Sequence, residues 1–273
     1  MPTIVDKART VEDLRNEFAA LAALCSSFAE DQWDVPTCLP GWTVRDVLSH
    51  VIGAESMLLG VPPPTVDTSH LGHMRNPVAE ANEVWVESMR SQTGDEMRAR
   101  FDDVTGRRLT ALDAMTQADF DAPSWTPAGH NETYGRFMRI RHYDCFMHEH
   151  DIRFAVGAPG REDSGDLQTA LDEVSTGLGY IVGRRAALPE GSRVRIVLTG
   201  PLATTYLVRV EGRAEVVEAL DQEPTVEIEL PTMLFLRLTG GRQDGPNGPA
   251  RDIKVSGDGR QGEALVANLA FTI

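Results

Sequence analysis

Apolar residues recur at intervals of three and four over residues 1–157, which predicts a series of long amphipathic helices. The first helix follows a capping box formed by Thr10 and Asp13, and its apolar stripe is Leu14, Phe18, Leu21, Leu24, Cys25 and Phe28. The second begins after Thr43, with Asp46 three residues on, and presents Val44, Val47, Leu48, Val51 and Leu58.

Two further helical regions follow in the same part of the chain. One runs from residue 77 to residue 115 with an interruption near Gly94, and the other covers residues 135–156 and ends at Gly157. Residues 123–129 between them are predicted as a loop. Four long helices joined by loops predict a four-helix bundle.

The remainder of the chain mixes helical and strand patterns. Helices are predicted at residues 166–184, 231–239 and 259–268, and strands at residues 194–199, 204–210, 225–230 and 252–255. Helices against an antiparallel sheet make an α+β fold. With a linker at residues 157–165, the predicted domains are a helical bundle at residues 1–158 and an α+β domain at residues 165–273.

The fourth helix carries charged residues on its apolar face. At about 100° per residue, one face holds Phe137, Ile140, Met147 and Ala155, and the opposite, solvated face holds Arg139, His142, Glu149, His150 and Arg153. Arg141, Asp144, His148 and Asp151 fall in the middle of the apolar face. Charged groups turned into a bundle are costly unless they are paired or bind a metal.

A metal site would satisfy these groups. Asp144 and His148 are four residues apart, so that their side chains can converge on one ion. The best third ligand is His50, at the border of the second helix's apolar stripe, and Arg141 and Asp151 would then orient the ligands and balance charge. Three nitrogen and oxygen ligands suit Zn²⁺ and leave coordination positions open, as in catalytic sites. The alternative is an internal ladder of salt bridges without a metal.

Composition narrows the range of partners. Among 273 residues, 41% are hydrophobic and 25% charged, as in ordinary globular proteins. The formal net charge of −15 argues against a nucleic-acid partner. No run of about 18 apolar residues predicts a membrane span, and the N-terminus lacks the apolar region of an export leader. Three widely spaced cysteines, Cys25, Cys38 and Cys145, fit a reducing cytoplasm. The oligomeric state is left open.

Two motifs resemble those of a known family. The run Leu39-Pro-Gly-Trp-Thr-Val-Arg-Asp-Val-Leu-Ser-His50 resembles the second-helix signature of the mycothiol-dependent maleylpyruvate isomerase family, which belongs to the DinB-like metal-binding bundles. The spacing of Arg141, Asp144, His148 and Asp151 resembles the fourth-helix motif of that family. The second domain resembles the family's C-terminal domain, which is similar to sterol-carrier-like α+β folds.

The resemblance implies a specific site. His50, Asp144 and His148 would be the metal ligands, zinc the usual metal and mycothiol the thiol co-substrate. The family carries Glu where this chain has Asp144, which is one methylene shorter and changes the distance to the metal. The family's C-terminal domain contributes an arginine to the active site, for which Arg242 is the best match and Arg237 the second.

The expected function is therefore that of an enzyme. It would use a divalent metal to activate a low-molecular-weight thiol for S-transfer to, or thiol-assisted isomerisation of, a small electrophile. Two alternatives follow from the same residues. One is a hydrolase that uses metal-bound water on a small molecule. The other is a non-enzymatic protein whose second domain holds an apolar ligand.

Overall fold

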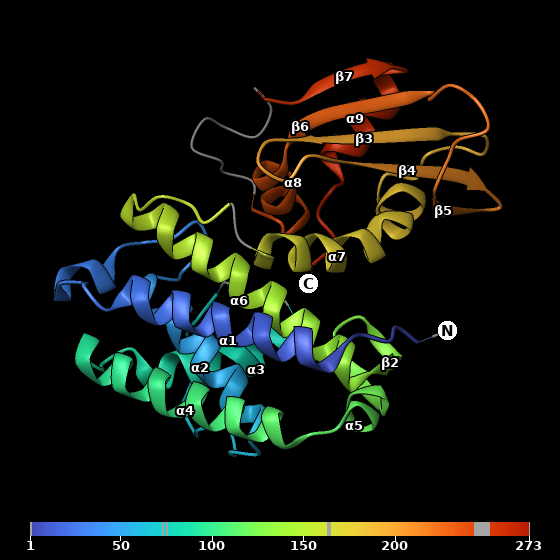
Figure 1. Cartoon of the computed structure of the whole chain (residues 1–273). Helices are drawn as coiled ribbons and strands as arrows, with labels where there is room; N and C mark the ends of the chain where they lie inside the picture. Colours follow the sequence, from blue (N-terminus) through green and yellow to red (C-terminus); the bar gives the residue numbers. More distant parts are fainter. Residues whose placement is uncertain (1, 73, 75, 163–164, 243–251, 273) are drawn as a thin grey trace. The chain divides into compact units, whose positions relative to one another are not determined.

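The computed structural model describes residues 2–72, 74, 76–162, 165–242 and 252–272 (Figure 1). The chain divides into two compact units, Met1–Gly160 and Arg161–Ile273. That these units are independent domains with the bounds 1–158 and 165–273 stays a prediction. Among the described residues, no helix is both long and apolar enough to cross a membrane.

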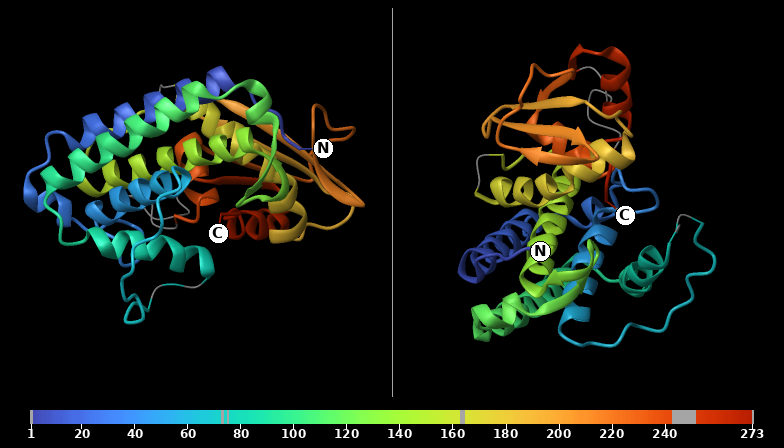
Figure 2. Two further views of the ribbon diagram at one scale, coloured as in Figure 1. Left: turned by 90° about the horizontal axis from the view of Figure 1, so that it is seen from below. Right: turned by 90° about the vertical axis from the view of Figure 1, so that its right-hand side faces the viewer.

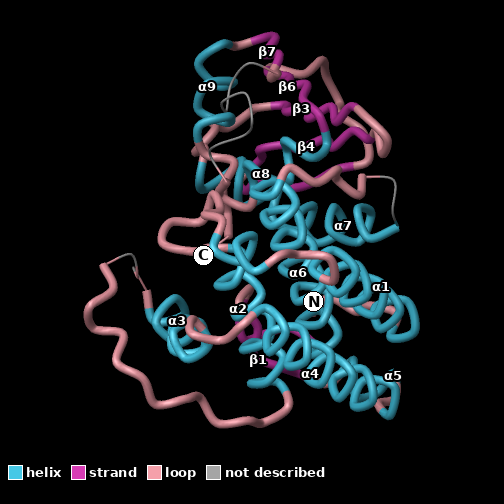
Figure 3. Tube along the Cα trace, turned by 90° about the vertical axis from the view of Figure 1, so that its left-hand side faces the viewer, coloured by secondary structure: helices cyan, strands magenta, loops and turns pink. Residues whose placement is uncertain are grey.

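Four long helices run side by side in the first unit, as predicted (Figures 1 and 2). They are α1 (Lys7–Cys25), α2 (Val44–Leu58), α4 (Gly94–Ala114) and α6 (Tyr134–Val156). Shorter elements are the 3₁₀ helix η1 (Glu30–Asp34), α3 (Pro77–Met89), which packs on α2, and α5 (Gln117–Asp121). Residues 60–72 form a long loop after α2, which is drawn in pink in Figure 3.

The bundle core is formed by the apolar stripes that the sequence pattern predicts. Leu14, Phe18 and Leu21 of α1 meet Val47, Leu48 and Val51 of α2 in one cluster with Phe101, Met138 and Cys145, and all of these are buried. Burial of these side chains supplies most of the driving force for folding of this unit. The helices that carry the candidate ligands therefore rest on a continuous core.

Helix caps set where α1, α2 and α6 begin and end. The predicted capping box at Thr43 and Asp46 is confirmed, with the Asp46 carboxylate accepting from the Thr43 backbone N–H at 2.9 Å. The predicted start at Thr10 is wrong, because Asp6 caps α1 earlier by accepting from the Arg9 backbone N–H at 2.7 Å. Gly157 ends α6 with a left-handed φ of 68°, as predicted.

Two features of the first unit differ from the predictions. Residues 123–129 are not a loop, because the strands β1 (Pro123–Thr126) and β2 (Gly129–Thr133) pair as an antiparallel hairpin that leads into α6. The strands are too short to show an alternating pattern. The solvated face predicted for α6 is also wrong, since His142, Glu149 and His150 are buried. Helix α6 contacts α1, α2, α5 and the hairpin, so more than one of its faces is covered.

The second unit places helices against a five-stranded sheet, and the predicted α+β class is confirmed (Figure 1). The strands are β3 (Arg193–Thr199), β4 (Thr204–Glu211), β5 (Arg213–Val217), β6 (Val226–Pro231) and β7 (Lys254–Gly257), in the order β5-β4-β3-β6-β7. Helices α7 (Gly165–Tyr180), α8 (Thr232–Thr239) and α9 (Gly259–Ala267) contact these strands, and the π-helical turn η2 (Ile181–Arg185) follows α7.

The sheet is mixed, which corrects the prediction of an antiparallel one. β3 pairs with β6 in parallel, with Ile196 opposite Ile228, while its other neighbour β4 is antiparallel. After the β4–β5 hairpin the chain crosses to the far side of β3, and strand patterns alone do not specify such a crossing. Alternating burial along β3 and β6 shows that one face of the sheet is covered.

Candidate metal centre

The three predicted ligands come together between two helices of the bundle. His50 lies in the middle of α2, and Asp144 and His148 are one turn apart on α6, which contacts α2. One potential ligand atom from each residue lies within 4.8 Å of the other two. The His50 Nε2 atom is 3.1 Å from Asp144 Oδ2, and the two imidazole rings meet edge to face with centroids 4.8 Å apart.

Asp151 fixes the orientation of His148. Its Oδ2 atom lies 3.2 Å from His148 Nδ1, and its Oδ1 atom accepts from the Cys38 thiol at 3.3 Å. Asp151 is fully buried, so the hydrogen bond to the imidazole is protected from water. A carboxylate on Nδ1 places the imidazole proton there and turns the Nε2 lone pair toward Asp144. This contact is compatible with the role that the sequence predicts for Asp151, which stays a prediction.

Arg141 contacts Asp144, the predicted carboxylate ligand, directly. Its Nη1 donates to Asp144 Oδ2 at 2.7 Å, and its Nε donates to Glu55 Oε1 at 2.9 Å. The second oxygen of Glu55 accepts from Arg108 Nε, also at 2.9 Å. Arg141 was predicted at the site, whereas Glu55 and Arg108 were not.

A sequence signal for these two residues did exist. Glu55 continues the apolar stripe of α2 that runs through Leu48 and Val51, and Arg108 continues the stripe of α4 that runs through Phe101 and Val104. A charged residue on an apolar stripe is the same signal that singled out Asp144.

Trp42 forms a wall of the site. Its indole ring lies 5.4 Å from the His50 ring and 6.2 Å from the His148 ring, between centroids. The indole Nε1 donates to Glu83 Oε2 at 2.9 Å, and Glu83 also accepts from Arg90 at 2.6 Å. The indole is thus held over both imidazoles and shields them from water on that side.

The protonation states suit a metal site. Burial lowers the pKa of His50, which Asp144 opposes only in part, so this imidazole is neutral at neutral pH. Burial alone would raise the pKa of Asp144, but the charge of Arg141 holds that pKa well below its usual range, and the adjacent imidazoles of His148 and His50 lower it further. Burial would likewise lower the pKa of Arg141, but the neighbouring carboxylate of Asp144 and other partners raise it. The site therefore offers a carboxylate and a neutral imidazole.

The donor set fits a divalent cation. Two imidazole nitrogens and one carboxylate oxygen are ligands that Zn²⁺ accepts, and three protein ligands leave positions for a substrate. Asp144 Oδ1 lies 3.6 Å from His148 Nε2, which is longer than an ordinary hydrogen bond, while Oδ2 is the oxygen that His50 and Arg141 contact. The Asp144 side chain is 31% exposed, which keeps the site open to solvent.

His50 lacks the support that Asp151 gives to His148. Its Nδ1 atom is buried and has no hydrogen-bond partner among residues 2–72, 74, 76–162, 165–242 and 252–272. An unpartnered buried nitrogen is costly. The His50 imidazole is positioned by its contact with Asp144 and by packing against Trp42 and His148.

The two predicted arginines lie in the second unit. Arg242 follows α8, is half-buried and donates through Nη1 to the Gly240 carbonyl oxygen at 2.6 Å. Arg237 lies on α8 and is buried. A role for either arginine beside His50, Asp144 and His148 stays a prediction.

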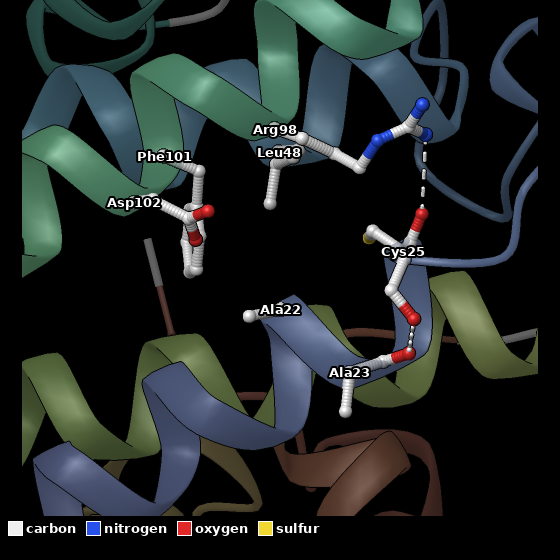
Figure 4. Close-up of a pocket in the computed structure, with 8 residues that line it drawn as sticks. Ala22, Ala23, Cys25, Leu48, Arg98, Phe101 and Asp102 are labelled. Atoms are coloured by element: carbon white, nitrogen blue, oxygen red, sulfur yellow. Dashed lines mark hydrogen bonds between the residues drawn. The ribbon is translucent and has the colours of Figure 1, made fainter.

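A separate pocket of about 300 Å³ opens between α1, α2 and α4 (Figure 4). Its lining is Ala22, Ala23, Cys25, Ser26, Leu48, Arg98, Phe101 and Asp102, so it holds none of the predicted ligands. Within this lining, Arg98 Nη1 donates to the Cys25 carbonyl oxygen at 3.4 Å. Burial raises the pKa of the Cys25 thiol to about 12, so this pocket offers no thiolate at neutral pH.

Comparison with known families covers most of the chain. Residues 14–153 match the mycothiol maleylpyruvate isomerase N-terminal domain, and residues 168–264 match the C-terminal domain of the same family. The chain belongs to the mycothiol-dependent maleylpyruvate isomerase family. The family predicted from the motifs of the second and fourth helices is therefore confirmed, and with it an enzyme of this kind.

Solved structures agree with the family at the level of the fold. The crystal structure of a mycothiol-dependent maleylpyruvate isomerase is 16% identical, covers 92% of this chain and 93% of its own, and gives a TM-score of 0.61. The structure of a point mutant of a mycothiol-dependent maleylpyruvate isomerase is 15% identical over the same shares, with a TM-score of 0.59. No curated protein sequence matches the chain.

Proposed function

We propose that this chain is a metal-dependent enzyme that activates a low-molecular-weight thiol, mycothiol, toward a small electrophile. The observation that carries the proposal is the convergence of His50, Asp144 and His148, with one potential ligand atom of each within 4.8 Å of the others. Family membership supports the thiol, because the matched domains are those of mycothiol maleylpyruvate isomerases. The cytoplasm is the proposed location, since none of the three cysteines forms a disulfide.

His50, Asp144 and His148 would hold the divalent ion, for which Zn²⁺ fits the donors best. When bound, the ion favours the thiolate form of the thiol at neutral pH. The protein's own contribution is to keep the donors in the right charge state. Asp151 holds the proton of His148 on Nδ1, and Arg141 keeps Asp144 ionised.

Two outcomes of thiolate attack are compatible with this site. In an isomerisation, the thiolate adds to one carbon of a conjugated double bond, the resulting single bond rotates, and elimination restores the thiolate and the double bond. In an S-transfer, the new carbon–sulfur bond persists. Either a leaving group departs from the attacked carbon with its bonding electron pair, or the enolate formed by addition to the double bond takes up a proton, and the thioether is released as product. Arg242 would bind a carboxylate of the electrophile if the second unit brings it to the site.

Substitution of one ligand tests the proposal. His148→Ala is expected to abolish stoichiometric metal and thiol-dependent turnover together, whereas His130→Ala, at an exposed position on β2, retains both. The measurements are elemental analysis of the purified protein and a thermal-shift series with Zn²⁺. Wild-type protein that holds no stoichiometric metal and gains no stability from Zn²⁺ would contradict the proposal.

The thiol requirement is tested separately. Turnover of a small electrophile is expected only when a low-molecular-weight thiol is present. Turnover that needs the metal but no thiol would instead assign hydrolysis by metal-bound water. Co-purified apolar ligand without metal would instead favour the non-enzymatic binding protein.

A further inference from the structure

A chain of buried charges leads away from the carboxylate ligand into the bundle. Arg108 of α4, Glu55 of α2 and Arg141 of α6 belong to three different helices. The Arg108 and Glu55 side chains are 2% and 1% exposed, so their ion pair is shielded from water. Arg141 is 8% exposed and joins this pair to Asp144.

The geometry restrains the guanidinium of Arg141. Its Nε donates to Glu55 Oε1 at 2.9 Å and its Nη1 donates to Asp144 Oδ2 at 2.7 Å. Because the guanidinium is planar, two hydrogen bonds to carboxylates on α2 and α6 fix both its position and its plane. Arg108 Nε donates to the other oxygen of Glu55 at 2.9 Å, which favours the orientation of Glu55 toward Arg141.

The charges of Arg141 and Glu55 also affect how readily Asp144 can bind a cation. Arg141 and a cation would share the same carboxylate, because Arg141 already donates to Oδ2 while Oδ1 lies toward His148. In the described part of the chain, Arg141 has two carboxylate partners, Glu55 and Asp144. Removal of the charge on Glu55 would leave Asp144 as the only one. Arg141 would then draw more strongly on Asp144 and oppose a second positive charge there.

We propose that Glu55 is a positioning residue of the metal centre, which orients Arg141 and balances its charge so that Asp144 can bind a divalent cation. Arg108 holds Glu55 in that position. This inference rests on the proposed function, since it assigns a role to Glu55 in the same metal site. The residues that support the proposed ligands would then include Glu55 and Arg108, and the support would extend to a third helix, α4.

The direct test is Glu55→Gln, which keeps the shape of the side chain and removes its charge. The probe is Co²⁺ alone, added to metal-free protein, with affinity measured by competition with a chromophoric chelator. Co²⁺ affinity is expected to fall about 10- to 100-fold, with a shift of the visible Co²⁺ absorption bands that reports altered coordination. A purely structural role would leave the affinity and bands of the folded variant unchanged.

Glu132→Gln is the matched control. Glu132 also accepts from an arginine of the same unit, Arg136, and from the Thr3 backbone N–H at 2.9 Å, but it contacts none of the ligands. Its substitution is expected to leave Co²⁺ affinity and absorption as in the wild type. An equal loss in this control would overturn the proposal, because the effect would then be general to the bundle.

A second variant covers the case in which Glu55→Gln does not fold. The double variant Glu55→Gln/Arg108→Met removes one charge of each sign, so the buried region stays balanced while Arg141 still lacks its partner. Its Co²⁺ affinity is expected to stay about 10- to 100-fold weaker than that of the wild type. Wild-type affinity in this variant would overturn the role of Glu55 and leave the metal site itself standing. Absence of Co²⁺ binding by the wild type would instead contradict the proposed function.

Discussion

In the ion network of Arg108, Glu55 and Arg141, we expect replacement of Glu55 to lower folding stability more than replacement of Arg108. Glu55 sits between two guanidinium groups, so Glu55→Gln leaves two buried positive charges that face a neutral amide. Removal of one partner of a buried ion pair costs about 3–5 kcal/mol. Arg108→Met, by contrast, leaves Glu55 paired with Arg141. It removes the charge-assisted hydrogen bond to Glu55, about 1.5–3 kcal/mol, together with the longer contact of Arg108 Nη2 to the Tyr134 hydroxyl at 3.3 Å.

Denaturation in urea, followed by far-UV circular dichroism with a chelator present, measures both costs without a contribution from bound metal. Glu55→Gln is expected to be the more destabilising substitution. The double variant is expected to lose less than the sum of the two single losses, by roughly 0.5–3 kcal/mol. If Arg108→Met costs as much as Glu55→Gln, or if the losses add, the three residues do not act as one network.

Three further outcomes are expected at positions away from the ligands. Gly53→Ala would place a Cβ 2.5 Å from Trp85 Cβ and should destabilise the bundle by about 1–3 kcal/mol. Gly106→Ala would meet no atom within 4 Å and should stabilise the bundle by about 0.4–1 kcal/mol. Thermal melts in which both variants shift the melting temperature in the same direction would refute this. Thr43→Ala removes the cap of α2 and should cost about 0.5–2 kcal/mol in a urea titration, and an unchanged midpoint would count against the cap. Cys25, whose pKa burial raises to about 12, should stay unmodified by iodoacetamide at neutral pH in native protein, as mass spectrometry would show, and rapid labelling would contradict its burial.

The bundle was predictable because its information is local. Each long helix carries its own apolar stripe, and caps such as Thr43 and Gly157 mark the ends. The pair Asp144 and His148 was predictable for the same reason, since a spacing of four residues within one helix is sufficient to bring two side chains together. His50 on α2 depended on the family resemblance as well, because its position at the edge of a stripe is also compatible with exposure to solvent.

What escaped prediction depends on which elements face one another. The contact between Arg108 and Glu55 requires that α4 and α2 pack in one register, which periodicity along either helix does not specify. The burial of Glu149 on α6 likewise depends on neighbours rather than on spacing. The parallel pairing of β3 and β6 depends on the path of the chain across the sheet. These features depend on the tertiary arrangement, which strand or helix propensity does not encode.

The distance along the chain between the proposed ligands has a consequence for folding. His50 and Asp144 are 94 residues apart in sequence, so the unfolded chain does not present the three donors together. In the proposed metal site, an ion would therefore bind strongly only after α2 and α6 have docked, and its binding free energy would then add to the stability of the docked state. The molar ratio of metal to protein in a sample would thus report the fraction of molecules in which α2 and α6 have docked correctly. Metal content would then measure the quality of the sample as well as its capacity for activity.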